Sequence, residues 1–119
     1  MPAPAPQPSE PISVIIADLF KALAHPARVR ILELLGEGEW SVGAMRPSVG
    51  IEFSNLSQQL AVLRQAGLVT SRKAGPVVFY AIKDPLVIDL LAAVKTLLIN
   101  SLTEARDLLS GLSAAASVP

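Results

Sequence analysis

Hydrophobic residues recur at helical spacing through the first third of the 119-residue chain. Between Ile12 and Ala24 they stand three or four positions apart, which is typical of an amphipathic helix. The pair His25-Pro26 interrupts this pattern, because the residue before a proline avoids the α conformation and a proline suits the first turn of a helix. We therefore predict one helix over Ile12–Ala24 and a second over about Pro26–Leu35, ended by Gly36.

Two short helices are predicted next. Trp40-Ser41 could pair as a very short strand, and Ser41 is placed as the N-cap of a helix over Val42–Arg46, which Pro47 and Gly50 end. Ser54 is placed as the N-cap of another helix, which ends near Ala66 with Gly67 as its C-cap.

The hydrophobic pattern then changes its period. Leu68–Lys73 and Val77–Ile82 have β-type alternation and flank the turn Ala74-Gly75-Pro76, which predicts a hairpin. A last helical pattern covers about Pro85–Leu112 and is apolar on nearly every side, so we expect that helix to be buried.

The two ends of the chain have a different composition. Met1–Pro11 holds five prolines, which predicts a disordered, extended arm over residues 1–11. Residues 113–119 are predicted to be a flexible tail, which leaves one domain over residues 12–112. The predicted fold class is mainly α with a small β-hairpin, in the order α-α-(β)-α-α-β-β-α, and this order contains a helix-turn-helix followed by a β wing.

The helix that begins near Ser54 has two chemically different sides. Leu56, Leu60 and Leu63 fall on one narrow stripe, which predicts contact with the core. The opposite side carries hydroxyl and amide groups and no acidic group, and such groups can bond base edges or phosphates in a major groove. Its residues are Ser54, Asn55, Gln58 and Gln65, with Ser57 beside them.

Charge is distributed unevenly although the formal net charge is zero. Residues 40–83 carry five basic side chains and one acidic side chain, whereas acidic groups are in excess on both sides of this segment. We expect Arg72 and Lys73 to lie at the hairpin tip beside Gly75, where they could reach a minor groove or the DNA backbone. The predicted DNA-binding residues are Ser54, Asn55, Ser57, Gln58, Gln59, Arg64, Arg72 and Lys73.

Three segments resemble the ArsR/SmtB family of bacterial winged-helix repressors. Phe20–Leu32 is similar to the junction between that family's first two helices, Ser54–Leu63 to its recognition helix, and Gly67–Val69 with Arg72, Lys73, Gly75 and Tyr80 to its wing. The resemblance covers about residues 14–109. It implies a homodimer, joined by the first and last helices, that binds a near-palindromic operator and releases it when an effector binds. The residues predicted for the dimer contact are Ile15, Leu19, Leu91, Val94, Leu98 and Leu102.

The chain departs from the family at both of its best-known metal sites. It has no cysteine, and Ser41–Arg46 offers no soft ligand except Met45, which we expect in the core. The last helix carries carboxylates but no histidine, with Leu91 and Leu102 where ligands would stand, and zinc, nickel and cobalt favour imidazole or thiolate. No cofactor is predicted, and a metal effector stays an alternative. His25 is a weak metal candidate, since a histidine before a helix-starting proline is more often a capping residue.

An enzyme is the first alternative class of function. The chain has one histidine, no Gly-rich phosphate loop and no clustered carboxylates, so no catalytic pair can be assembled and an enzyme is not expected. Two alternatives remain. One is a protein-interaction and dimerisation module that needs a partner or co-regulator, and the other is a metal-responsive sensor with a non-cysteine site. The N-terminus lacks a secretory signal, and the apolar stretch Leu86–Ile99 is shorter than the roughly 20 residues of a spanning helix, so we expect a cytoplasmic protein.

Overall fold

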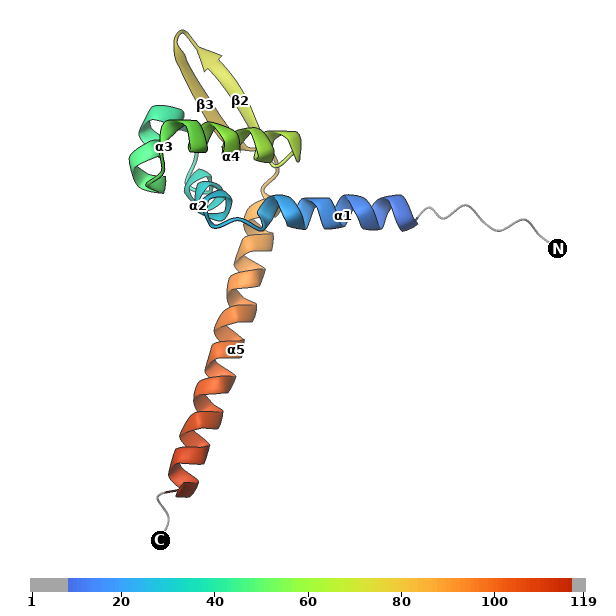
Figure 1. Cartoon of the computed structure of the whole chain (residues 1–119), viewed down its shortest axis with the longest axis vertical. Helices are drawn as coiled ribbons and strands as arrows, with labels where there is room; N and C mark the ends of the chain where they lie inside the picture. The colour runs from blue at the N-terminus through green and yellow to red at the C-terminus, as the bar shows by residue number, and fades with distance from the viewer. Residues whose placement is uncertain (1–8, 117–119) are drawn as a thin grey trace, which may run out of the picture. The chain divides into compact units, whose positions relative to one another are not determined.

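The computed structural model describes residues 9–116 of the chain. Within that range five helices and three strands follow one another in the order α1, α2, β1, α3, α4, β2, β3, α5. The chain divides between Pro85 and Leu86 into two units. The first holds α1 to β3, and the described part of the second is α5 (Figure 1).

Helix α1 spans Ser9–Leu23 and α2 spans Pro26–Leu35. The bounds predicted for α2 are confirmed, but α1 begins earlier than predicted, so the last three residues of the predicted arm are helical. Pro11 fits there because backbone N–H groups in the first turn have no partner within the helix. Residues 1–8 of that arm lie outside the described residues. His25 caps α2 as expected, since its Nδ1 accepts a hydrogen bond from the Ala27 N–H at 3.1 Å.

Helix α3 spans Val42–Val49. The predicted cap is confirmed, because the Ser41 Oγ accepts a hydrogen bond from the Ala44 N–H at 3.1 Å. The predicted last residue, Arg46, is wrong, whereas the prediction that Gly50 ends the helix is confirmed. Pro47 lies inside the helix, which continues to Val49 and ends at Gly50, whose φ of 76° is left-handed.

Helix α4 spans Phe53–Gln65. The prediction that Ser54 is its N-cap is therefore wrong, because Ser54 is the second residue of the helix. The N-cap is Glu52, whose backbone is extended and whose carbonyl accepts the Leu56 N–H at 2.9 Å, while its side chain makes no capping bond. At the other end, Gly67 N–H bonds to the Arg64 carbonyl and Leu68 N–H to the Leu63 carbonyl, both at 3.0 Å. This pair of bonds is a Schellman motif, and it needs the positive φ of Gly67.

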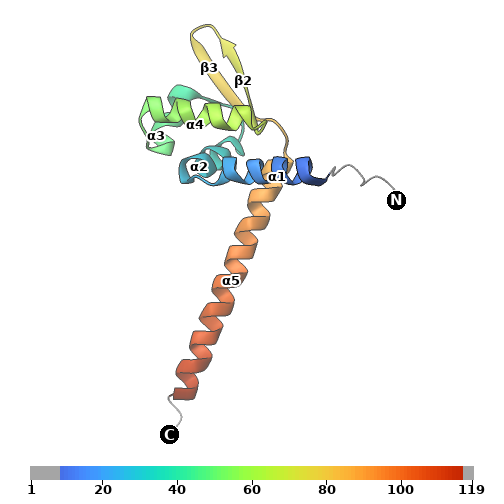
Figure 2. The ribbon, with the colours of Figure 1, turned by 45° about the vertical axis from the view of Figure 1, so that its right-hand side comes forward.

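The three strands form one antiparallel sheet in the order β1-β3-β2. Strand β1 is the short segment Trp40–Ser41, β2 is Val69–Ala74 and β3 is Val77–Ile82, as the sequence predicted within one residue. Ala74 pairs with Val77, so Gly75 and Pro76 alone form the turn, and Gly75 takes a positive φ. Figures 1 and 2 show the β2–β3 hairpin projecting from the group of helices α2, α3 and α4.

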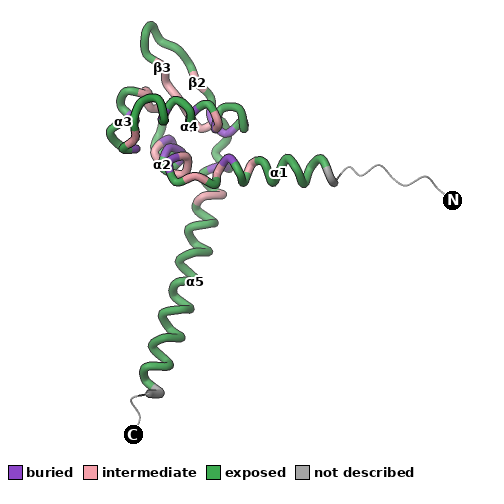
Figure 3. Tube along the Cα trace, viewed as in Figure 1, coloured by how far each residue is buried: buried purple, intermediate pink, exposed green. Residues whose placement is uncertain are grey.

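The core of the first unit lies between α2, α3, α4 and the base of the hairpin (Figure 3). Met45 is fully buried there, as predicted. The largest buried side chains come from every helix of this group: Ile31, Leu32, Met45, Val49, Leu56, Leu60 and Leu63.

Helix α5 runs without a break over Leu86–Ala116, so the first residues of the predicted flexible tail are helical. Most of its apolar side chains are exposed, including Val94, Leu98 and Leu102, so the expected burial of this helix is not found in the single chain. The segment Leu86–Ala114 is long and apolar enough to cross a membrane by length and composition alone. The prediction that this apolar stretch is too short to span a membrane is therefore wrong, because the apolar pattern does not stop at Ile99.

Candidate nucleic-acid interface

The two sides of α4 lie as the sequence predicted. Leu56, Leu60 and Leu63 are buried, while Ser54 and Gln58 are exposed. Ser57 and Gln65 are exposed as well. The outer face of α4 therefore presents hydroxyl and amide groups to solvent, from a helix that its leucines hold on the core.

Gln59 does not belong to that face. It is 9% exposed, its amide nitrogen donates to the Asn55 Oδ1 at 2.9 Å, and its Oε1 accepts a hydrogen bond from Arg28 Nη1 at 2.8 Å. The prediction that Gln59 is available to DNA is wrong. At 100° per residue it stands only about 60° from Leu56, so it points inward with the leucines.

Arg28 is a residue that sequence reasoning missed. Its Nε donates to the Ala22 carbonyl at 2.6 Å and its Nη2 to the Lys21 carbonyl at 3.2 Å, in addition to the bond to Gln59. The guanidinium thus ties the last turn of α1 to α4. No local pattern could have shown this, because Gln59 is 31 residues away along the chain.

Asn55 and Arg64 lie on the edges of the polar face. Asn55 is exposed, but its carbonyl oxygen is engaged with Gln59, which leaves its amide N–H groups for a further partner. Arg64 is exposed in the last turn of α4 and lies beside Ala61, Gln65 and Tyr80 along a shallow hollow.

Arg72 and Lys73 are not at the hairpin tip. The tip is Gly75-Pro76, whereas Arg72 pairs across the sheet with Phe79 and Lys73 with Val78. Neighbouring residues of a strand point to opposite faces, so the Arg72 and Lys73 side chains leave the sheet on opposite sides. The prediction of a paired cationic tip is wrong.

Arg72 is held by the protein itself. Its Nε and Nη2 bond to the two carboxylate oxygens of Glu39 at 2.7 and 2.5 Å, and its guanidinium carbon lies 4.4 Å from the centre of the Phe79 ring. The hydrogen bond to Arg72 holds the pKa of Glu39 below its usual value, and the same bond raises the pKa of Arg72. Lys73 is exposed and forms no ion pair within the described part of the chain, so it is the wing cation open to a partner.

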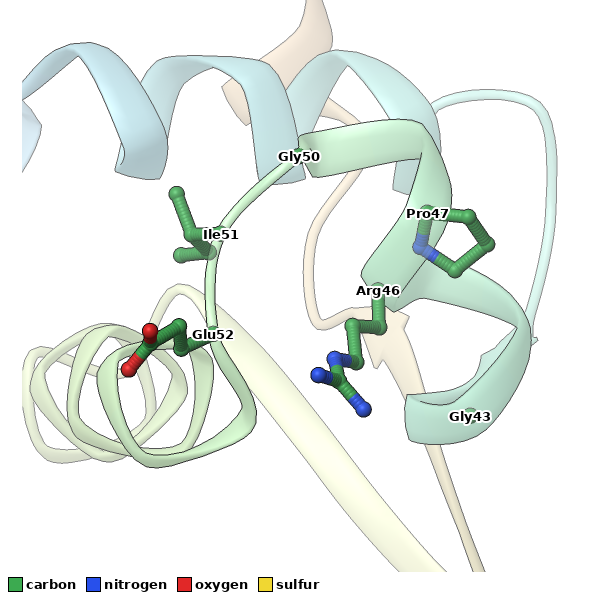
Figure 4. Close-up of a pocket in the computed structure, with 6 residues that line it drawn as sticks. All are labelled: Gly43, Arg46, Pro47, Gly50, Ile51 and Glu52. Atoms are coloured by element: carbon green, nitrogen blue, oxygen red, sulfur yellow. The ribbon is translucent and has the colours of Figure 1, made fainter.

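A second missed cation lies in the last turn of α3, just before the segment that leads to α4. Arg46 is exposed and lines a surface hollow with Gly43, Pro47, Gly50, Ile51 and Glu52. Figure 4 shows the Arg46 side chain extending from α3 and the Glu52 side chain extending from the segment that leads into α4. They form no ion pair with each other within residues 9–116. The excess of basic residues in this segment was the available signal.

No group of three metal-ligating side chains occurs among the residues that the structure describes. The Nδ1 of His25, the weak candidate, is occupied by its capping bond.

Known helix-turn-helix regulators are similar to this chain in sequence and in fold. The family model of a helix-turn-helix domain matches residues 23–72. Rv0081 of Mycobacterium tuberculosis, an uncharacterized HTH-type transcriptional regulator, is 48% identical over 110 residues, which are 92% of this chain and 96% of that protein. Its crystal structure covers 80% of this chain and 96% of its own with a TM-score of 0.75.

A second solved structure comes from Mycobacterium bovis. It is the homodimeric winged helix-turn-helix DNA-binding domain of Mb0332, a possible ArsR-family regulator, with 30% identity, a TM-score of 0.78 and coverage of 87% of this chain and 95% of that one. The present chain belongs to the ArsR/SmtB family of winged helix-turn-helix transcriptional regulators. The biofilm growth-associated repressor of Xylella fastidiosa is a further relative, 39% identical over 69% of this chain and 72% of its own length. In the present chain, α3 and α4 are the helix-turn-helix and β2–β3 is the wing. The predicted fold class is confirmed.

Proposed function

We propose that this regulator represses transcription by binding a near-palindromic DNA duplex as a homodimer. The observation that carries the proposal is the outer face of α4, which is polar, exposed, without an acidic side chain and backed by buried leucines. The first residues of a recognition helix reach base edges in the major groove, and hydroxyl and amide groups are suited to bind there. Repression is supported by the relative that is named a biofilm growth-associated repressor.

The contacts are divided between bases and backbone. We propose that Ser54, Asn55, Ser57 and Gln58 face base edges or nearby phosphates. Exposed cations around them supply the sequence-independent attraction to phosphates. These are Arg46, Arg64 and Lys73, and Arg72 joins them only if it leaves Glu39.

The homodimer is proposed from the apolar side chains of α1 and α5. Leu91, Val94, Leu98 and Leu102 recur at spacings of three and four, so they share one side of α5. Ile15 on α1 is 66% exposed, and Leu19 is partly exposed. The neighbour Mb0332 is homodimeric, and a second copy would cover these surfaces. We therefore interpret α5 as a dimer helix of a cytoplasmic regulator and not as a membrane span.

The test is a titration of the full chain with the duplex upstream of its own gene, labelled and followed by mobility shift at two salt concentrations. A regulator shifts this duplex. The shift weakens as salt rises, because the basic side chains that bind phosphates release counterions from the DNA, and added salt opposes that release. A module that only binds other proteins would give no shift at either salt concentration. That result would reject the proposal.

A further inference from the structure

One large apolar side chain stands at the start of the recognition helix. Phe53 is the first residue of α4 and is 56% exposed. Among the large hydrophobic residues of positions 26–82, only Val77 at 40% is also classed as exposed. A single exposed apolar residue is ordinary on a protein surface, so exposure alone indicates no function. The position of Phe53 is what distinguishes it.

That position is defined by the neighbours of Phe53. It lines one hollow together with Ser57, one turn further along α4, and with Pro76 and Val77 of the wing. Phe53 therefore lies on the side of α4 that faces the hairpin, at the helix end from which base edges are read. The side chain of Glu52, the residue before it, makes no capping bond, and Ser54 after it is the first residue of the polar face.

The chemistry of a phenyl ring at this place is selective. Guanine, cytosine and adenine present acceptor or donor atoms in the major groove that a phenyl ring cannot bond, whereas thymine adds an apolar C5-methyl group. Contact with that methyl group removes apolar surface of both partners from water. We propose that Phe53 is a specificity-determining residue that contacts the C5-methyl group of one thymine in each half-site. This inference rests on the proposed DNA-binding function.

The experiment removes the two partners separately. Duplexes that bind the full chain are selected from a random pool, and each thymine of the selected site is then replaced in turn by deoxyuridine, which lacks only the methyl group. Equilibrium affinities are measured by fluorescence anisotropy for the wild type, Phe53→Ala and Phe53→Gln. Val77→Ala is the control, because it removes the other exposed apolar side chain and leaves Phe53 in place.

We expect one thymine at which deoxyuridine weakens wild-type binding about fourfold per half-site, the size expected for one buried methyl group. Phe53→Ala and Phe53→Gln should not distinguish thymine from deoxyuridine there, while Val77→Ala should. If deoxyuridine weakens binding equally in all four proteins, or in none, the contact does not exist. If Phe53→Ala weakens all sequences alike, the ring packs on the backbone and the inference also fails. Absence of any selected duplex would instead reject the proposed function. Far-ultraviolet circular dichroism checks that the exposed position tolerates both variants.

Discussion

Gln58 and Gln59 are adjacent in the chain but have different environments. Gln58 is exposed on the polar face of α4, whereas Gln59 is buried and hydrogen-bonded to Arg28 and Asn55. A helix turns 100° per residue, so one step along it separates a solvent-facing amide from an internal one.

Substitution of these two residues should affect different properties. Gln58→Ala should weaken binding to the selected duplex by about 1–3 kcal/mol and leave the free energy of unfolding unchanged. Gln59→Ala should lower the free energy of unfolding by about 1–3 kcal/mol, because it leaves Arg28 with an unpaired N–H. Anisotropy titrations and urea unfolding measure the two effects, and a Gln58→Ala protein with unaltered sequence preference would show that Gln58 reads no base.

The two wing cations, Arg72 and Lys73, also differ in whether the protein itself engages them. Arg72 is paired with Glu39, and because the pKa of Glu39 is lowered, this pair is intact above the usual carboxyl pKa and is lost only as the pH falls through the lowered value. At neutral pH the pair is therefore formed. Arg72 is then less available than Lys73 to bind a phosphate.

Salt dependence should separate these two cations. For a dimer, Lys73→Ala should reduce the slope of log affinity against log salt by about 2, since each lost phosphate contact removes about 0.9. Glu39→Gln should steepen the slope, because it weakens the ionic hold on Arg72. Titrations at several salt concentrations and neutral pH measure both slopes. An unchanged slope in Lys73→Ala would exclude the wing from the phosphate contacts.

At the scale of elements, the orientation of α4 depends on a residue outside it. Arg28, on α2, bonds the last turn of α1 through the carbonyls of Lys21 and Ala22 and bonds α4 through Gln59. Three nitrogens of one planar group serve these bonds, and charge-assisted bonds of this kind are stronger than neutral ones.

Loss of the Arg28 hydrogen bonds should lower the stability of the regulator and weaken the attachment of α4 to the last turn of α1. Arg28→Ala should lower the free energy of unfolding by about 2–3 kcal/mol. Arg28→Lys should restore only part of it, because an ammonium group cannot reproduce the guanidinium fork. Urea unfolding of both variants is compared with Arg30→Ala, a control on the same helix whose single bond to the Ser48 carbonyl is exposed and 3.4 Å long. Equal stability of Arg28→Ala and Arg30→Ala would contradict the role of Arg28.

At the scale of the whole molecule, the exposed apolar side of α5 has to be explained. Leu98 and Leu102 are 56% and 69% exposed in a single chain, within the stripe assigned to the dimer contact. Two recognition helices held by one dimer can reach successive major grooves, which one copy cannot do.

A charge in that stripe should separate the copies. Leu98→Glu should yield monomers by light scattering, because the carboxylate would be buried without a partner, and DNA affinity should fall with the dimer. Asn100→Glu adds the same charge two residues away, about 200° around the helix, and should remain dimeric. A stable Leu98→Glu dimer would refute this interface.

Local patterns along the chain were enough to predict the order of elements, the bounds of α2, the hairpin and the leucine stripe of α4. These features depend on local periodicity and on proline and glycine, whose backbone preferences act within a few residues. Tertiary structure alone decided that Gln59 and Arg72 are engaged internally, that Arg28 joins α1 to α4, and that Ser54 lies inside a helix and not at its cap. Each of these depends on where a chain segment ends or on a partner about thirty residues distant, and side-chain hydrogen bonds across that separation leave no periodic trace in the sequence.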